Sequence, residues 1–321
     1  MPIQSPSRYQ PRFPFTNGHV QTVFPNLFRQ VGDIPYERYR LSTVDGDFLD
    51  LDFSRIGAQR IAVIVHGLEG NSHRPYVLGM VRALNLAQWD AVALNLRGCS
   101  GEPNRNLRFY HSGDSNDLRS AVEHLLLAGY RRIDLIGFSL GGNIVLKYLG
   151  EESANVNPAI ATGVVFSVPC DLRSSSAQMG CPANRFYMIR FLRLLRHKIR
   201  LKMQQFPGEI DDADYDEIQT FVEFDDRYAP LYGFAGASDY YEKASSKPLL
   251  RHIAIPVLMV NAADDPFLPT LCYPAAEASD NPRLHLEIPR YGGHVGFVTF
   301  TAGNSYWSES RAIDFIMGHA S

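Results

Sequence analysis

The stretch that decides the fold is IDLIGFSLGGNIVLKYLG, residues 133–150. Its first part, 133–138, is a short apolar run of the kind that forms a buried strand. The part that starts at 143 has the apolar spacing of an amphipathic helix and continues to 151. Between them, GFSLG places Ser139 on a sharp strand–turn–helix connection, which exposes the side chain above the sheet and requires glycine on both sides. Ser139 is therefore a candidate nucleophile.

Short apolar runs recur outward from this stretch and alternate with helical segments. Besides 133–138, the predicted strands are 61–65, 91–96, 163–168, 256–262 and 284–288, and a further amphipathic helix is predicted at 117–129. Buried strands that alternate with helices predict an α/β fold, with a mostly parallel central sheet and helices on both faces. Alternating residues around Asp45-Gly46 predict an antiparallel hairpin at the leading edge of that sheet.

Two segments depart from this alternation. Residues 1–35 contain six prolines and four phenylalanines, so we expect an irregular arm without a long helix, packed on the body. About 85 residues without a strong strand pattern separate the strand that ends near Val168 from the next one, which is far longer than a normal loop. We expect a helical cap there, at about 171–250, inserted into a single domain that spans 1–321.

The expected cap has an uneven charge distribution. The segment RFYMIRFLRLLRHKIRLKM, 185–203, is basic and helical, and an acidic segment follows at 208–226. Mutual pairing of the two segments is the favoured interpretation. Peripheral contact of the basic helix with an anionic lipid surface is the alternative.

Composition narrows the classes of function. The net charge of −3 gives no general attraction to nucleic acid or to anionic membranes. The four cysteines lack CxxC or metal-ligand spacing, so we expect reduced thiols and no metal or other cofactor. No apolar stretch is long enough to span a bilayer, and the N-terminus lacks the apolar region of a secretory signal. We therefore expect a cytoplasmic protein without stable membrane insertion and without a nucleic-acid partner.

A nucleophilic serine needs a base, and the base needs a carboxylate to orient it. His294 is the candidate base, because it lies on a glycine-rich loop after the last predicted strand. Asp264 and Asp265 follow the strand 256–262. Asp265 is preferred because Asp-Pro-x-x-Pro is typical of the turn after the acid, and Asp264 stays open as the alternative. The order Ser, Asp, His fits a catalytic triad.

The sequence HGLEG, 66–70, directly follows the strand 61–65. A tight turn there would direct backbone N–H groups at the space above the serine. Acyl transfer needs two such donors for its oxyanion, and the backbone amides of Leu68 and Leu140 are the predicted pair. His66 is expected to hold the turn rather than to catalyse.

Taken together, these residues resemble the α/β-hydrolase superfamily and, more narrowly, its AB hydrolase-4 (YheT-like) family. The motifs that carry the resemblance are Asn17-Gly18-His19-Val20-Gln21-Thr22, HGLEGNSHRPY (66–76), NLRGCSGEPN (95–104), YHSGDSNDL (110–118), GFSLGGNIVLKYLGE (137–151), DDPFLP (264–269) and GGHVGF (292–297). The resemblance implies an α/β-hydrolase fold, a triad of Ser139, Asp265 and His294, and hydrolysis of carboxylic esters. Arg97 recurs in these motifs. An ion-paired loop anchor is its favoured role, and contact with a substrate carboxylate is the alternative.

We therefore expect a serine esterase that cleaves short- to medium-chain acyl esters, with a small-molecule ester as its substrate and an acyl-enzyme as its intermediate. One alternative is an acyltransferase that uses the same triad. The His-x4-Asp motif discussed for such members is absent, since His111 leads to Asn116. The other alternative is a catalytically silent receptor for a small molecule.

Overall fold

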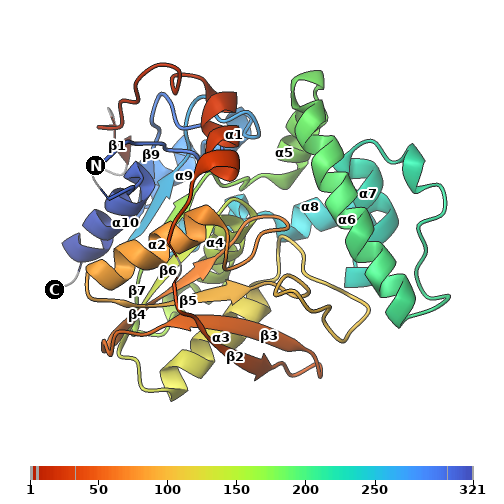
Figure 1. Cartoon of the computed structure of the whole chain (residues 1–321), viewed down its shortest axis with the longest axis horizontal. Coiled ribbons are helices and arrows are strands. Elements are labelled where there is room, and N and C mark those ends of the chain that lie inside the picture. Colours follow the sequence, from red (N-terminus) through yellow and green to blue (C-terminus); the bar gives the residue numbers. More distant parts are fainter. Residues whose placement is uncertain (1–2, 5–6, 33, 302, 320–321) are drawn as a thin grey trace.

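The computed structural model describes residues 3–4, 7–32, 34–301 and 303–319 (Figure 1). Within them, nine strands form one sheet in the order β1-β9-β8-β7-β6-β4-β5-β3-β2. Neighbouring strands from β1 to β5 run parallel, whereas β3 is antiparallel to both β5 and β2. The strands are β1 (Ile3–Gln4), β2 (Glu37–Ser42), β3 (Phe48–Ser54), β4 (Arg60–Val65), β5 (Asp90–Asn95), β6 (Arg132–Phe138), β7 (Ile160–Phe166), β8 (Val257–Val260) and β9 (Leu284–Glu287).

Each predicted strand is present, and the expected hairpin is the pair β2 and β3. Strand β4 shows why these segments are strands. Alternate side chains point to opposite faces of a sheet. Ile61, Val63 and Val65 accordingly lie in the apolar core on one face, and Ala62 and Ile64 lie in the core on the other. A strand buried on both faces needs apolar residues at every position, as the sequence has.

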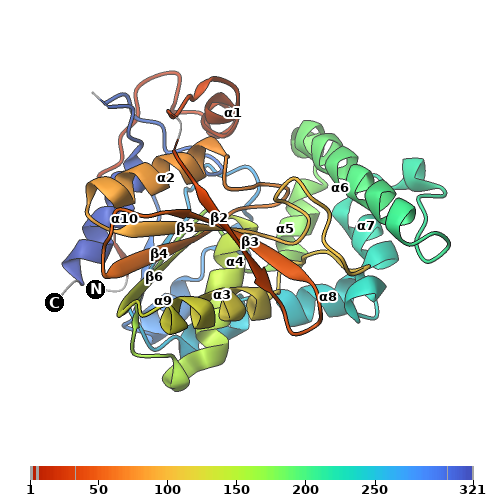
Figure 2. The same ribbon diagram turned by 60° about the horizontal axis from the view of Figure 1, so that its bottom comes forward.

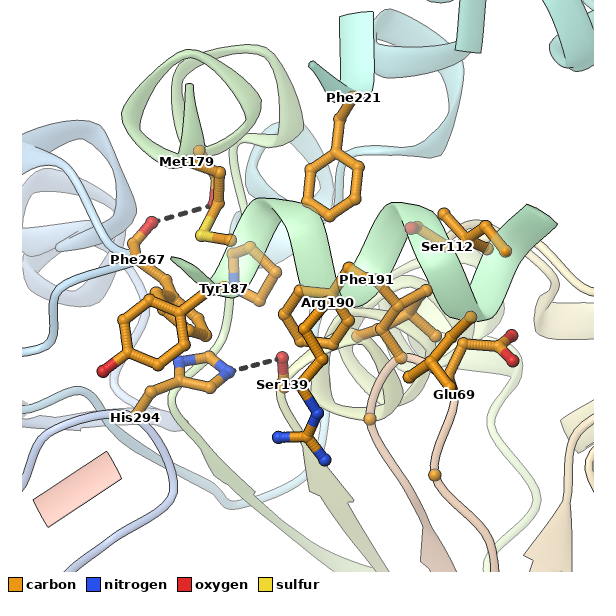
Figure 3. A pocket seen from close by; sticks show the side chains of 18 of the residues that line it. Glu69, Ser112, Ser139, Met179, Tyr187, Arg190, Phe191, Phe221, Phe267 and His294 are labelled. Carbon is orange, nitrogen blue, oxygen red and sulfur yellow. Dashed lines mark hydrogen bonds between the residues drawn. The ribbon is translucent and has the colours of Figure 1, made fainter. Parts of the chain in front are cut away.

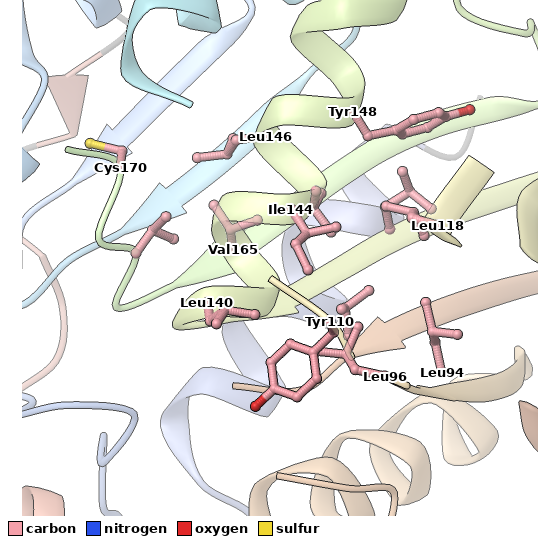
Figure 4. Packing of buried hydrophobic residues seen from close by; sticks show 14 of the residues in the cluster. Leu94, Leu96, Tyr110, Leu118, Leu140, Ile144, Leu146, Tyr148, Val165 and Cys170 are labelled. Carbon is pink, nitrogen blue, oxygen red and sulfur yellow. The ribbon is translucent and has the colours of Figure 1, made fainter. Parts of the chain in front are cut away.

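Helices cover both faces of the sheet (Figure 2). Helices α2 and α10 contact each other and share one core, and α3, α4 and α9 contribute to the other. In Figure 4, Ile144 of α4 lies among Leu118, Leu94 and Val165, which come from α3, β5 and β7. The helices are α1 (Gly18–Phe28), α2 (Pro75–Leu86), α3 (Ser115–Leu127), α4 (Leu140–Glu152), α5 (Leu172–Met179), α6 (Arg185–Gln205), α7 (Phe221–Tyr228), α8 (Ala237–Ala244), α9 (Ala275–Asp280) and α10 (Trp307–Gly318).

The expectation of an irregular N-terminal arm is wrong for α1. This helix contains Pro25, which the sequence argument took as a sign against helix. The side chain of Asn17 accepts hydrogen bonds from two amides of the first turn and so caps the helix. Gln21 and Thr22 are buried against the loop that carries His294. Tertiary packing therefore outweighs the hydrogen bond that proline removes.

The interval between β7 and β8 is helical, as predicted, and contains α5, α6, α7 and α8. We refer to residues 171–250 as the inserted segment. In Figures 1 and 2 its helices stand to one side of the sheet, and the longest of them is α6. None of the helices that the structure describes combines the length and the apolar character that a bilayer crossing requires.

The basic residues of α6 differ in the groups that they contact. Arg196 and Arg200 both contact Asp212, so for them the prediction of pairing with the acidic segment is confirmed. For two buried lysines it is wrong. Lys198 pairs instead with Glu69, and Lys202 donates to backbone carbonyls of the sheet domain. Both lysines thus fasten the inserted segment to the body of the molecule.

Candidate active site

Ser139 lies on the turn between β6 and α4, with a φ of 53° that non-glycine residues seldom adopt. The flanking glycines allow this turn because neighbouring backbone is very close. A Cβ on Gly137 would lie 2.6 Å from the Cα of Gly142, and a Cβ on Gly141 would lie 2.3 Å from the carbonyl oxygen of Val65. The local sequence therefore dictates the sharp turn that carries Ser139.

The structure brings the three predicted catalytic side chains together, and Figure 3 shows two of them, Ser139 and His294. The Ser139 hydroxyl lies 2.8 Å from Nε2 of His294 and can donate its proton there. Nδ1 of the same imidazole lies 3.0 Å and 3.1 Å from the two carboxylate oxygens of Asp265. The Asp265 side chain is fully buried, so little water competes for this contact.

Asp264, the alternative acid, contacts a different group. Its Oδ1 accepts a hydrogen bond of 2.9 Å from the backbone amide of Gly293, the residue before His294. Burial raises the pKa of Asp264. This carboxyl group therefore contacts the backbone of the histidine loop, while Asp265 contacts the imidazole.

Helix α1 positions the histidine loop, a role that the residue pattern did not predict. The Thr22 hydroxyl accepts a hydrogen bond of 2.9 Å from the His294 amide. Gln21 accepts from the amide of Val298 at 2.9 Å. Gly18 lies so close that a Cβ there would be 1.9 Å from the carbonyl oxygen of Asp264. The signal was present in the family motif at 17–22, but nothing local indicated what it contacts.

The turn after β4 approaches Ser139 from the other side. A Cβ on Gly67 would lie 3.1 Å from the Cβ of Ser139. Within the described part of the chain, neither the Leu68 amide nor the Leu140 amide has a hydrogen-bond acceptor. Leu140 begins α4, where N–H groups point outward without partners in the helix.

Side chains of His66, Tyr110 and Lys198 help to hold that turn. His66 is buried, donates from Nδ1 to the carbonyl of Gly67 and accepts from the Leu96 amide, so it has the structural role expected of it. Burial lowers the pKa of His66 to about 4, which keeps the ring neutral. Glu69 has a φ of 51°, and its carboxylate accepts a hydrogen bond of 2.7 Å from the Tyr110 hydroxyl. Its carboxylate also pairs with Lys198 at 2.9 Å.

Arg97 is an ion-paired anchor, the role favoured for it from the sequence. It is buried and pairs with Asp45, Asp47 and Asp117. It therefore fastens the β2–β3 turn to α3 and is absent from the cavity wall.

A cavity of about 530 Å³ opens beside Ser139 and His294. Its wall is mostly apolar and aromatic, with contributions from the sheet domain, α1 and the inserted segment, as Figure 3 shows for Met179, Tyr187 and Phe221. Two titratable groups in the wall are partly buried. Burial lowers the pKa of His111 to about 3 and raises the pKa of Asp225 to about 7. The site can therefore take a largely apolar molecule of the size of a typical ligand.

No group of three or more His, Cys, Asp or Glu side chains in the described ranges has the arrangement of a metal site. All four cysteines are free thiols, as predicted, and Cys181 is exposed while the other three are buried.

Known proteins are similar to this chain in sequence and in fold. A model of the alpha/beta hydrolase fold family matches residues 63–196. YheT of Escherichia coli (strain K12) is 37% identical over 324 residues, which cover 98% of this chain and 94% of that protein. Monoacylglycerol lipase of Saccharomyces cerevisiae is 30% identical over 286 residues, 85% of this chain and 61% of that protein.

Among solved structures, the Pyrococcus furiosus esterase Pf2001 superposes with a TM-score of 0.61 at 16% identity, over 91% of this chain and 99% of that one. This likeness concerns the fold, which is the predicted one. With the fold, the serine turn and the near full-length similarity in agreement, the chain belongs to the α/β-hydrolase superfamily and, within it, to the YheT-like (AB hydrolase-4) family.

Proposed function

We propose that this protein is a serine esterase that hydrolyses carboxylic esters through Ser139, His294 and Asp265. The observation that carries the proposal is the 2.8 Å contact between the Ser139 hydroxyl and His294 Nε2, at the wall of a mostly apolar cavity. The other nitrogen of the ring contacts Asp265, as a general base requires. Relatives named as a lipase and a structural neighbour named as an esterase support the same reaction.

In the proposed mechanism, Ser139 Oγ attacks the ester carbonyl carbon while its proton passes to His294 Nε2. Asp265 fixes the tautomer and stabilises the imidazolium that forms. The amides of Leu68 and Leu140 donate hydrogen bonds to the oxyanion, and their lack of other acceptors supports this role. His294 then protonates the departing alcohol, which leaves an acyl group on Ser139.

In the second half of the reaction, His294 removes a proton from water, and the water oxygen attacks the acyl carbonyl. Collapse of this intermediate releases the acid and returns the proton to Ser139. The cavity volume of about 530 Å³ supports short- to medium-chain acyl groups. We further propose that residues 171–250 act as a cap over a single catalytic domain and that the enzyme works in the cytoplasm on small-molecule esters.

The test is the variant Ser139→Ala. It should lose hydrolysis of p-nitrophenyl butyrate and covalent labelling by a fluorophosphonate probe. Ser176→Ala is the matched control, since Ser176 also lines the cavity and should keep the labelling. Labelling that survives Ser139→Ala would refute the assignment. Ester products formed with added alcohol would instead favour the acyltransferase alternative.

A further inference from the structure

Apolar side chains surround the entrance of the cavity. Leu27 of α1 and Phe186 of α6 both line it, yet they are 67% and 69% exposed, so they stand where it opens to solvent. Next to them on the same helices, Phe28 is 66% exposed and Ile189 is 50% exposed. We call these four residues the entrance surface. Isolated exposed apolar residues are ordinary, but a group at the opening of an apolar cavity indicates a binding surface.

The two helices that form this surface lie together. Nδ1 of His19, at the start of α1, is 3.0 Å from the hydroxyl of Tyr187, at the start of α6. Figures 1 and 2 both show α1 and the first turns of α6 at the same end of the molecule. The exposed apolar side chains therefore flank one opening.

Three arginines accompany the entrance surface. Arg185, Arg190 and Arg193 are exposed residues in the first half of α6, and none of them has an ion-pair partner within the ranges that the structure describes. In the second half of the same helix, Arg196 and Arg200 are paired with Asp212. The protein has a net charge of −3, so this local excess of positive charge is confined to part of its surface.

We propose that the entrance surface docks on an anionic lipid layer, with Arg185 and Arg193 against the headgroups and Arg190 at the cavity wall between them and Ser139. Phosphate groups give guanidinium ions bidentate partners, and the adjoining acyl region accepts phenylalanine, leucine and isoleucine side chains. A second copy fits less well, because a two-fold interface would place the same arginines opposite one another. Docking in this position directs the cavity opening at the lipid, and only this last consequence rests on the proposed function.

The experiment measures co-sedimentation of the full chain with phosphatidylglycerol vesicles and with phosphatidylcholine vesicles. We expect binding to the anionic vesicles only, and weaker binding as salt is added. Arg185→Gln with Arg193→Gln should weaken binding about 25-fold, because each arginine at an anionic surface contributes about a factor of five. Phe28→Ser with Ile189→Ser should weaken it by at least about tenfold.

Matched controls use residues elsewhere. Arg196→Gln with Arg200→Gln changes the net charge equally on the same helix, and Leu86→Ser with Leu127→Ser removes exposed apolar side chains from α2 and α3. Both controls should bind as the wild type does. The proposal is overturned if anionic vesicles are not bound, if phosphatidylcholine is bound equally, or if the controls weaken binding as much. A concentration-dependent dimer that Phe28→Ser dissolves, without vesicle binding, would assign the surface to a second copy.

Hydrolysis of dissolved p-nitrophenyl butyrate keeps the two proposals apart. Arg185, Arg193, Phe28 and Ile189 do not line the cavity, so their variants should keep this activity while vesicle binding falls. Ser139→Ala should show the reverse, with activity lost and vesicle binding retained.

Discussion

Replacing Lys198 with methionine should weaken the attachment of α6 to the turn that carries Leu68. Lys198 Nζ lies 2.9 Å from Glu69 Oε1 and 3.2 Å from Cys99 Sγ. The Lys198 and Glu69 side chains are only 7% and 11% exposed. Methionine has a similar length and fills most of the same space without charge. The Glu69 carboxylate would then keep the Tyr110 hydroxyl as a donor but lose its cation.

The expected cost follows from this burial. Removing one partner of a buried ion pair destabilises a protein by about 3–5 kcal/mol, because the other charge stays buried without compensation. We expect a loss of about 3 kcal/mol in the free energy of unfolding, since Tyr110 still donates to Glu69. Loss of one oxyanion donor lowers kcat by about 10²–10³, and a displaced turn that still carries the Leu68 amide should lower it by about tenfold.

The assay combines urea unfolding with kcat and KM for p-nitrophenyl butyrate. Lys198→Met, Glu69→Gln and the double variant form a double-mutant cycle, in which we expect a coupling of at least about 1.5 kcal/mol. Arg196→Met is the matched control on the same helix, because its partner Asp216 is exposed and its contact with Asp212 is only partly buried, so that water screens both contacts more than it screens the Lys198 pair. It should unfold and turn over as the wild type does.

Two results would refute this reasoning. Additive losses in the cycle would show that Lys198 and Glu69 are not energetically coupled. A lower free energy of unfolding with unchanged kcat would show that the ion pair supports the fold without positioning the turn.

Three further predictions concern the histidine loop and the cavity. Thr22→Val leaves the buried amide of His294 without an acceptor, at a cost of about 1–3 kcal/mol, and should lower kcat about tenfold, whereas Thr22→Ser keeps the hydroxyl and should retain most of the rate. Asp265→Asn should lower kcat by about 10⁴-fold. Asp264→Asn should lower kcat far less, because an amide oxygen can still accept the hydrogen bond from the Gly293 amide. Equal losses of kcat in steady-state kinetics would contradict Asp265 as the acid. Burial raises the pKa of Asp225 from 3.8 to about 7, so the folded protein holds a proton that the unfolded chain releases and stability falls as the pH rises through this window. Urea unfolding should therefore show that the free energy of unfolding of Asp225→Asn, relative to that of the wild type, increases as the pH rises from about 4 to about 7. A difference between the two proteins that stays constant with pH would show that this carboxyl group does not titrate there.

The α/β fold and the serine turn were accessible from the sequence because their signals are local. Strand β6 and helix α4 need only the apolar periodicity of adjacent residues, and the turn between them needs only glycines at 137 and 141. The arm was misjudged for the opposite reason. Pro25 is an unfavourable local signal, and the packing that keeps α1 helical comes from a loop more than 260 residues further along the chain.

The choice between Asp264 and Asp265 shows where local signals stop. Both follow β8, and only the conformation of the turn decides that one contacts the imidazole and its neighbour contacts the backbone of the histidine loop. The sequence offered a preference from a proline pattern and no means of placing the second carboxyl group.

By itself, then, the sequence determined the alternation of strands and helices around the central sheet, the serine turn and the histidine loop, because hydrophobic periodicity and backbone sterics act over a few residues. The tertiary structure alone decided that Thr22 holds His294 across 272 residues, that Lys198 ties α6 to Glu69, and which apolar side chains stand at the cavity entrance. Such contacts depend on how distant segments meet in space, and a hydroxyl or an ammonium group carries no local sign of its partner.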